Sequence, residues 1–364
     1  MRFLRADWGL YVAALGLSLV GAVLVWSATH HTVGPALAVR HLINTTIGLG
    51  LALVLVRTDV RWLRAAAPWV YLAGLAGLLL VLSPLGVTVN GSRSWIHLPG
   101  GFSLQPAELS KIALVIGLAM ILAEGRDRQR PPRAREVLTA WVLAGIPIGL
   151  ILLQPDLGTA LVLGFLTIGV VAASGAARGW TVAAVAGVVA AVWAALAVPL
   201  LEDYQVDRLL AFLDPELDPE GIGYQTRQVR LAIGSGGWEG AGLGEGLQTQ
   251  GGFIPYQYTD FIFSVAGEEL GFWGAAGLVA LLGFLIVRAL WVALHSEDRF
   301  GRLVAVGVAS WFAFQTFQNI GMNLGVMPVT GLPLPFLSYG GSSMFACWLA
   351  IGLLACAQNT PTRR

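Results

Sequence analysis

Residues 260–294 read DFIFSVAGEELGFWGAAGLVALLGFLIVRALWVAL, and the part from Leu270 to Val287 contains no charged side chain. A helix that crosses the hydrocarbon core of a bilayer needs about 20 predominantly apolar residues. The stretch is longer than this, so it predicts a membrane-spanning helix that tilts or extends beyond the bilayer.

Comparable apolar runs recur along the whole chain, which is 56% hydrophobic and 12% charged. A soluble globular protein carries about 25% charged residues. Backbone groups in lipid must be hydrogen-bonded internally, so the runs predict an all-α, polytopic membrane helical bundle formed by one domain, residues 1–364. The ten predicted transmembrane helices are 8–29, 40–56, 66–86, 106–123, 137–153, 157–174, 180–200, 260–294, 303–325 and 340–357.

The arginines predict the orientation of this bundle. One set of alternate loops and both termini hold Arg2, Arg5, Arg57, Arg61, Arg64, Arg126, Arg128, Arg130, Arg133, Arg135, Arg178, Arg299, Arg302, Arg363 and Arg364. The other set holds Arg40, Arg93, Arg208, Arg227 and Arg230. Cytoplasmic loops are the more basic, so both termini are expected in the cytoplasm, and the first helix is expected to be an uncleaved signal anchor.

Three predicted extracytoplasmic loops stand out. They cover about 87–105, 201–259 and 326–339, and the large middle one joins the seventh and eighth helices. Loops of the length of 201–259 are uncommon unless they are functional. The last, GVMPVTGLPLPFLSYGG, has three prolines and no charge, so it cannot be a continuous helix and is expected to fold back into the protein or the outer leaflet.

Other functional classes find little support. The net charge of +1 argues against nucleic acid as a partner. The five histidines lack the spacing of zinc ligands, and Cys347 and Cys356 lie in one predicted helix without a disulfide framework.

Ionisable residues within membrane helices are costly and usually mark function. Glu108 and Lys111, in QPAELSK, are three residues apart and therefore neighbours on one helix face. Lys111 is the one lysine of the chain. The pair pins helices together, positions substrate phosphate or carboxylate, or tunes a neighbouring acid.

Two aspartates lie at predicted helix starts. Asp156, in QPDLGT, is an N-cap or a site residue. Asp260 is also a candidate N-cap, but Glu268 follows eight residues later, about 12 Å further along the same predicted helix face. Capping alone does not explain two carboxylates on one face, which favours a functional role for Asp260; Glu268 is open.

Further polar residues have alternative explanations. The ninth predicted helix carries a stripe of polar residues, and Asn44 is a polar residue within the second predicted helix. Interhelical hydrogen bonding explains both. Arg227 and Arg230 are solvated surface charges or a fork that binds phosphate. The stripe consists of Gln315, Gln318, Asn319 and Asn323.

The predicted topology brings the charged residues together. Glu108, Lys111, Asp156 and Asp260 all fall at outer helix ends. Transporters bind near the bilayer midplane, so this placement favours chemistry on a lipid-borne head group at the outer surface.

Seven motifs resemble, in order, those of the SEDS family. They are NGSRSW, QPAELSKIA, QPDLGT, GYQTRQVRLAIGSGG, TDFIFSVAGEELG, QNIGMNLG and PLPFLSYGGSS, and they cover most of residues 90–343. Within the family, PVTGLPLPF is more similar to the elongation branch, RodA, than to the division branch, FtsW.

The resemblance implies a peptidoglycan glycosyltransferase of the bacterial cytoplasmic membrane that polymerises lipid II during cell elongation. It implies Asp260 as the catalytic base of an inverting transfer. The substrate-binding candidates are Glu108, Lys111, Trp95, Asp156, Arg227, Arg230, Ser264 and Glu268. No metal ligand is assigned, although a divalent cation, Mg²⁺ or Mn²⁺, would assist the leaving diphosphate. The family usually has an acidic residue and a histidine where this chain has Tyr256 and Tyr258.

The same resemblance implies partners, namely a class B penicillin-binding transpeptidase, with MreC and MreD nearby. Two other functional classes remain open. A lipid II flippase would use Glu108, Lys111 and the polar ninth helix as a transport path. A scaffold of the elongation machinery would use the ion pairs only to hold helices together.

Overall fold

The computed structural model describes residues 7–89, 91–98, 102–123, 131–197 and 221–358. Several predicted features lie outside these residues. They are the terminal arginines, Arg126, Arg128, Arg130, Arg208 and the first half of the large loop, up to residue 220.

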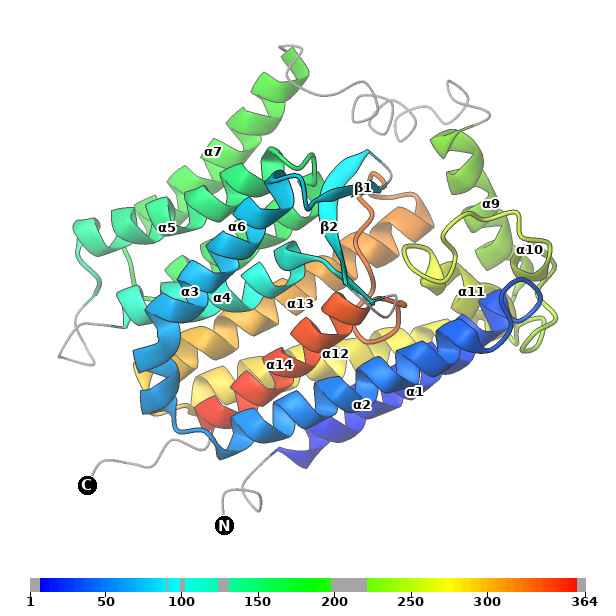
Figure 1. Cartoon of the computed structure of the whole chain (residues 1–364), viewed down its shortest axis with the longest axis horizontal. Helices are drawn as coiled ribbons and strands as arrows, with labels where there is room; N and C mark the ends of the chain where they lie inside the picture. The colour runs from blue at the N-terminus through cyan, green and yellow to red at the C-terminus, as the bar shows by residue number, and fades with distance from the viewer. Residues whose placement is uncertain (1–6, 90, 99–101, 124–130, 198–220, 359–364) are drawn as a thin grey trace.

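Helices that run side by side form most of the described chain (Figure 1). The long ones are α1 (Trp8–Thr29), α2 (Ala36–Arg57), α3 (Val60–Leu82), α4 (Pro106–Leu122), α5 (Ala134–Leu152), α6 (Leu157–Ala173), α7 (Arg178–Ala197), α12 (Gly271–His295), α13 (Arg299–Leu324) and α14 (Gly341–Gln358). The shorter α9 (Ile222–Ser235), α10 (Leu247–Gln250) and α11 (Ile262–Glu269) precede α12.

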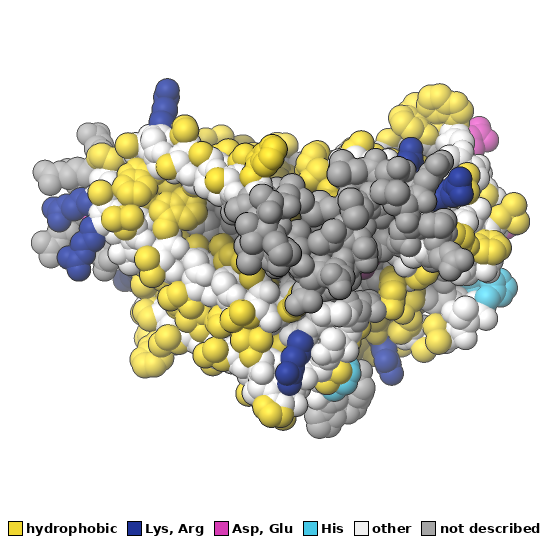
Figure 2. Space-filling model, turned by 90° about the horizontal axis from the view of Figure 1, so that it is seen from above, with side chains coloured by type: hydrophobic (Ala, Val, Ile, Leu, Met, Phe, Trp, Pro, Cys, Tyr) yellow, Lys and Arg dark blue, Asp and Glu magenta, His cyan; other side chains and the backbone are white. Residues whose placement is uncertain are grey.

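Within the described part, seven helices are long and apolar enough to cross a membrane: α1, α2, α3, α5, α12, α13 and α14. The apolar α6 is shorter, and α4 contains Glu108 and Lys111. The chain is thus a helical, multi-pass membrane protein, while the number of ten spans stays a prediction. Hydrophobic side chains cover much of the described surface in Figure 2, and Lys and Arg side chains are few and scattered among them, as expected of a surface that faces lipid.

The prediction of one continuous helix over 260–294 is wrong. The segment forms α11 and α12, which meet at Leu270. Gly271 has a φ of 65°, and a Cβ there would lie 2.3 Å from the Gly240 nitrogen. The chain therefore bends where a Gly-rich loop packs directly on it, and Asp260 precedes α11 instead of sharing a helix face with Glu268.

A small antiparallel sheet adds to the expected all-α fold. It consists of β1 (Val87–Val89), β2 (Ser92–Leu98) and β3 (Phe102–Leu104), in the order β1-β2-β3. Val87 pairs with Trp95, and Ile96 pairs with Leu104. Successive side chains of β2 point to opposite faces, and Ser94 and Ile96 lie on the buried one, so the described residues of 87–105 form a sheet against the helices (Figure 1).

Loops predicted on the same side of the membrane contact one another. At the predicted inner end, Arg299 donates to the Ser174 carbonyl (2.7 Å), and Arg64 pairs with Asp298 (3.2 Å). At the predicted outer end, hydrogen bonds join Ser92 to Gln154, Gln105 to Ser342, Gln257 to Ala28 and Tyr339 to Tyr258. The two sets of loops lie at opposite ends of the bundle; which end faces the cytoplasm stays a prediction.

Of the two predicted places for the Pro-rich loop 326–339, the protein and the outer leaflet, the structure shows the protein. Leu332, Leu334, Phe336 and Leu337 are buried. Three residues of the polar stripe of α13 bind carbonyls of this loop, and Gln315 also accepts an interhelical hydrogen bond from Lys111 of α4 (2.9 Å). Gln315 donates to Pro333 (2.7 Å), Gln318 to Pro328 (2.9 Å) and Asn319 to Leu332 (2.7 Å). Irregular backbone at this depth is tolerated because its acceptors are paired.

Helices α2 and α14 pack closely through glycines. A Cβ at Gly48 would lie 2.7 Å from Cδ1 of Trp348, which is fully buried. A Cβ at Gly352 would lie 2.9 Å from the Ala52 Cα. Small residues permit this approach of membrane helices and fix the register between α2 and α14.

The substitution Gly48→Ala should reduce the free energy of unfolding by about 1–3 kcal/mol, because the added methyl group overpacks the contact with Trp348. Gly50→Ala is the matched control, since a Cβ at Gly50 of the same helix meets nothing within 4 Å. Thermal unfolding of both variants in detergent checks this. Equal unfolding midpoints for the two variants would contradict the packing argument.

Candidate active site

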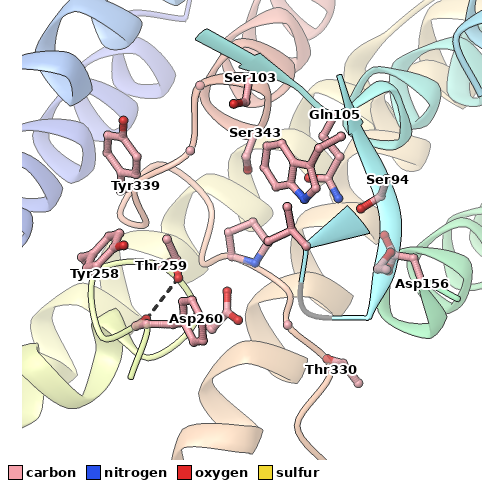
Figure 3. A pocket seen from close by; sticks show the side chains of 18 of the residues that line it. Ser94, Ser103, Gln105, Asp156, Tyr258, Thr259, Asp260, Thr330, Tyr339 and Ser343 are labelled. Atoms are coloured by element: carbon pink, nitrogen blue, oxygen red, sulfur yellow. Dashed lines mark hydrogen bonds between the residues drawn. The ribbon is translucent and has the colours of Figure 1, made fainter. Parts of the chain in front are cut away.

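A cavity of about 470 Å³ opens among the loops of the predicted outer end. Its walls come from the start of α2, the sheet, the start of α6, the segment 256–260, the Pro-rich loop and the start of α14 (Figure 3). Of the predicted site residues, Asp260, Asp156 and Trp95 line it. Three segments far apart in the sequence thus contribute a candidate residue each to one cavity.

The backbone around Asp260 is held at several points. The Asp260 carbonyl accepts hydrogen bonds from Asn319 Nδ2 (2.8 Å) and Asn323 Nδ2 (3.3 Å) of α13. The preceding carbonyl, of Thr259, accepts from Ser338 Oγ (2.5 Å). These bonds fix the main chain on which the Asp260 carboxylate projects.

The Asp260 carboxylate lies beside the Pro-rich loop. Oδ2 of Asp260 is 3.6 Å from the position of a Cβ at Gly331, whose φ is 70°. Glycine is suited to that conformation and leaves the space next to the carboxylate open. Phe261 is the N-cap of α11 and forms no side-chain cap, so the alternative role of Asp260 as a cap is wrong.

Asp156 does serve as an N-cap, and it also lines the cavity. Its Oδ1 accepts from the Thr159 amide (3.0 Å), and its Oδ2 accepts from Thr159 Oγ1 (2.8 Å). Burial raises the pKa of Asp156, and the hydrogen bonds from Thr159 lower it in part. Asp156 and Asp260 lie on different sides of the cavity in Figure 3. The predicted cap is therefore confirmed, and a site role for Asp156, which lines the cavity, stays a prediction.

Glu108 and Lys111 form a buried ion pair behind the cavity instead of lining it. Lys111 Nζ donates to Glu108 Oε1 (2.6 Å) and to Gln315 Oε1 (2.9 Å), and the two side chains are 0% and 1% exposed. Gln315 in turn donates to the Pro333 carbonyl, and Pro333 lines the cavity. The pair thus acts on the site through Gln315 and the Pro-rich loop.

Glu268 lies outside the lining of the cavity. It accepts hydrogen bonds from the Gln248 amide (2.7 Å), the Thr249 amide (2.9 Å) and Thr249 Oγ1 (2.7 Å). The Thr249 carbonyl accepts from Gln257 Nε2 (3.0 Å), close to Asp260 in the chain. Glu268 therefore holds α10, which supports the segment before Asp260.

The other candidates are also outside the lining. Ser264 is buried and its Oγ donates to the Phe261 carbonyl (2.7 Å). Arg227 and Arg230 are exposed on α9, and the Arg230 side chain lies against Gly325 at the end of α13. The structure does not bring the predicted phosphate-binding cations, Lys111 included, into the cavity.

Sequence reasoning missed Arg40 and Asn44 as site residues. Both line the cavity from the first turns of α2. Their spacing of four residues at a predicted outer helix end places them on one face, and this was the available signal. Tyr258 also lines the cavity; burial raises its pKa, with smaller contributions from Tyr256, Tyr339 and Asp260, so it stays a neutral phenol.

The described residues contain no group of three or more His, Cys, Asp or Glu side chains arranged for a metal ion. Mg²⁺ is commonly bound by one or two carboxylates together with substrate phosphates. Asp156 and Asp260 are the carboxylates of the cavity available for this.

Comparisons with known proteins agree with the geometry. Residues 7–362 match the family model described as "Cell cycle protein", FtsW/RodA/SpoVE. The chain is similar to the "Probable peptidoglycan glycosyltransferase FtsW" of Trichlorobacter lovleyi (38% identity, 97% of this chain and 93% of the relative). It is also similar to the "Peptidoglycan glycosyltransferase MrdB" of Escherichia coli K12 (37% identity, 93% and 90%).

Two solved structures are similar over nearly the whole chain. One was described as "Structural coordination of polymerization and crosslinking by a peptidoglycan synthase complex" (TM-score 0.82, 37% identity, 97% of both chains). The other is the rod shape determining protein RodA of Thermus thermophilus (TM-score 0.72, 33% identity, 98% of both chains).

The substitution Lys111→Met should lower the free energy of unfolding by about 3–5 kcal/mol, because it leaves the buried Glu108 carboxylate without its cation. The double variant Glu108→Gln/Lys111→Met should recover much of this loss, since no buried charge remains. Thermal unfolding in detergent measures both. A double variant no more stable than Lys111→Met would contradict the account of the pair.

Proposed function

The chain belongs to the FtsW/RodA/SpoVE family, and on that premise we propose that it polymerises lipid II at the outer face of the bacterial cytoplasmic membrane. The curated relatives it matches are named as peptidoglycan glycosyltransferases. The observation that carries the proposal is the cavity at the predicted outer end, which Asp260 lines beside the Pro-rich loop.

In this proposal Asp260 is the general base. The 4-hydroxyl of one lipid-linked disaccharide attacks the anomeric carbon of another, and its proton passes to the Asp260 carboxylate. The bond from that carbon to the phosphate oxygen breaks, and the lipid diphosphate leaves with the electron pair. An α-linked donor gives a β-linked glycan in this single displacement.

Residues around Asp260 support this role. Main-chain hydrogen bonds from Asn319, Asn323 and Ser338 hold the segment 259–260, so the base is preorganised. Trp95 and Asp156 line the same cavity and are proposed to contact the sugars. A divalent cation would supply positive charge to the leaving diphosphate.

The buried candidates are assigned an indirect role. Glu108, Lys111 and Glu268 position the cavity through Gln315 and α10. Because Glu108 and Lys111 pair with each other behind the cavity, a transport path through them finds less support than catalysis at the outer end.

We also propose a class B penicillin-binding transpeptidase as partner, because a similar structure belongs to a complex that couples polymerisation with crosslinking. Relatives of this chain include both FtsW and MrdB. The proposed elongation role, with MreC and MreD nearby, rests on the RodA-like sequence of the Pro-rich loop.

Asp260→Asn should abolish polymerisation of labelled lipid II without loss of folding, since the amide cannot accept the proton. Purified wild type and variant are compared on gels, each with and without the transpeptidase partner. Asp298→Asn is a matched control at the opposite end of the bundle, where Asp298 caps α13. Polymer from Asp260→Asn at the wild-type rate would show that Asp260 is not the base.

A further inference from the structure

The start of α14 forms one wall of the cavity. Gly340, Gly341 and Ser343 line it, and α14 is 18 residues long. Among the described residues, no acceptor is seen for the amides of Gly341, Ser342 and Ser343. The N-terminus of a helix carries free N–H groups and partial positive charge, both of which suit an anion.

Asn44 of α2 lies directly against this helix start. Its Nδ2 is 3.3 Å from the position of a Cβ at Gly341, and its side chain lines the cavity. Asn44 is 5% exposed, and its Oδ1 is buried without a partner in the described chain. A buried amide is costly unless its groups are hydrogen-bonded. Toward an anion only the Asn44 Nδ2 can act, as a donor, and it lies at the cavity beside the first turn of α14.

Arg40 supplies charge on the same side. It lies one turn before Asn44 on α2, lines the cavity and is exposed. Arg40 is the one Arg or Lys among the described lining residues, while the carboxylates of Asp156 and Asp260 line other walls. A guanidinium and free backbone amides are both hydrogen-bond donors, and together they can bind different oxygens of one phosphate group.

Packing fixes these groups relative to each other. The glycine contacts of Gly48 with Trp348 and of Gly352 with Ala52 lock α2 against α14. A Cβ at either glycine would clash, so the helices cannot slide without losing this contact. Arg40, Asn44 and the first turn of α14 are therefore preorganised.

We propose that the N-terminus of α14, together with Arg40 and Asn44, forms the subsite that binds the diphosphate of a lipid-linked saccharide. This inference rests on the proposed function, because it names the group that the same cavity grips. Arg40, Asn44 and the first amides of α14 then take the phosphate-binding role that the sequence suggested for Lys111, Arg227 and Arg230, which do not line the cavity.

The test uses the purified full chain in detergent with EDTA and three probes: farnesyl diphosphate, farnesyl monophosphate and farnesol. The rise in unfolding midpoint with probe concentration gives the apparent affinity. Wild type should prefer the diphosphate. Arg40→Ala and Asn44→Ala should weaken diphosphate binding by roughly 10- to 100-fold, the range expected for charge-assisted hydrogen bonds. Arg40→Lys should lose less than Arg40→Ala.

Arg57→Ala is the matched control, because Arg57 is an exposed arginine at the opposite end of α2. It should bind like wild type. Farnesol affinity should be the same in all variants, which separates loss of the anion site from misfolding. No preference of wild type for the diphosphate, or unchanged affinity in both Arg40→Ala and Asn44→Ala, would overturn the proposal.

A parallel lipid II assay separates this inference from the proposed function. Arg40→Ala should lower kcat/KM roughly 10- to 100-fold, with partial recovery in Arg40→Lys. Diphosphate binding through Arg40 without any polymerisation by wild type would refute the proposed function and leave the subsite standing. Polymerisation by wild type with a fully active Arg40→Ala would refute the subsite alone.

Discussion

The arrangement of this protein depends on the hydrogen bonding of a non-helical loop within a membrane bundle. The Pro-rich loop 326–339 pairs only part of its own backbone, through the Leu334 carbonyl, and lipid offers no partner for the rest. The amides of Gln315, Gln318 and Asn319 on α13 satisfy its carbonyls. Asn319 also binds the carbonyl of Asp260, so the loop and the candidate base share one support.

The buried charges serve the same support. Lys111 donates to both Glu108 and Gln315, and Gln315 donates to the Pro333 carbonyl of the Pro-rich loop. The ion pair is thereby connected to the loop. Glu268 holds α10 and, through Thr249 and Gln257, the segment before Asp260. Polar groups that look like a transport path in sequence are thus a framework for one cavity, in which Asp260, Asp156, Trp95 and Arg40 are brought together.

Long apolar runs predicted the helices well, because hydrophobic length is a local property that one segment carries alone. The bend at Leu270 was missed because it results from the Gly-rich loop that packs on Gly271. Topology and motif order placed Asp260 and Asp156 at one end of the bundle, and both line one cavity there, while their roles stay predictions. Lys111 lies outside the lining of the cavity and Arg40 lies within it, because of the helix faces that turn toward the cavity. The packing of α2 on α14 and of α4 on α13 determines these faces, and a local sequence pattern does not show it.

In the proposed function, the cavity at the predicted outer end holds the reacting lipid-linked sugar. Photocrosslinking with a lipid II analogue that carries a diazirine on its sugar tests it most directly, with labelled peptides read by mass spectrometry. The account predicts labels in the segments 92–98, 256–260 and 330–343, each of which contributes residues to the lining of the cavity. Labels confined to the opposite end of the bundle, such as residues 57–64 and 296–302, would contradict it.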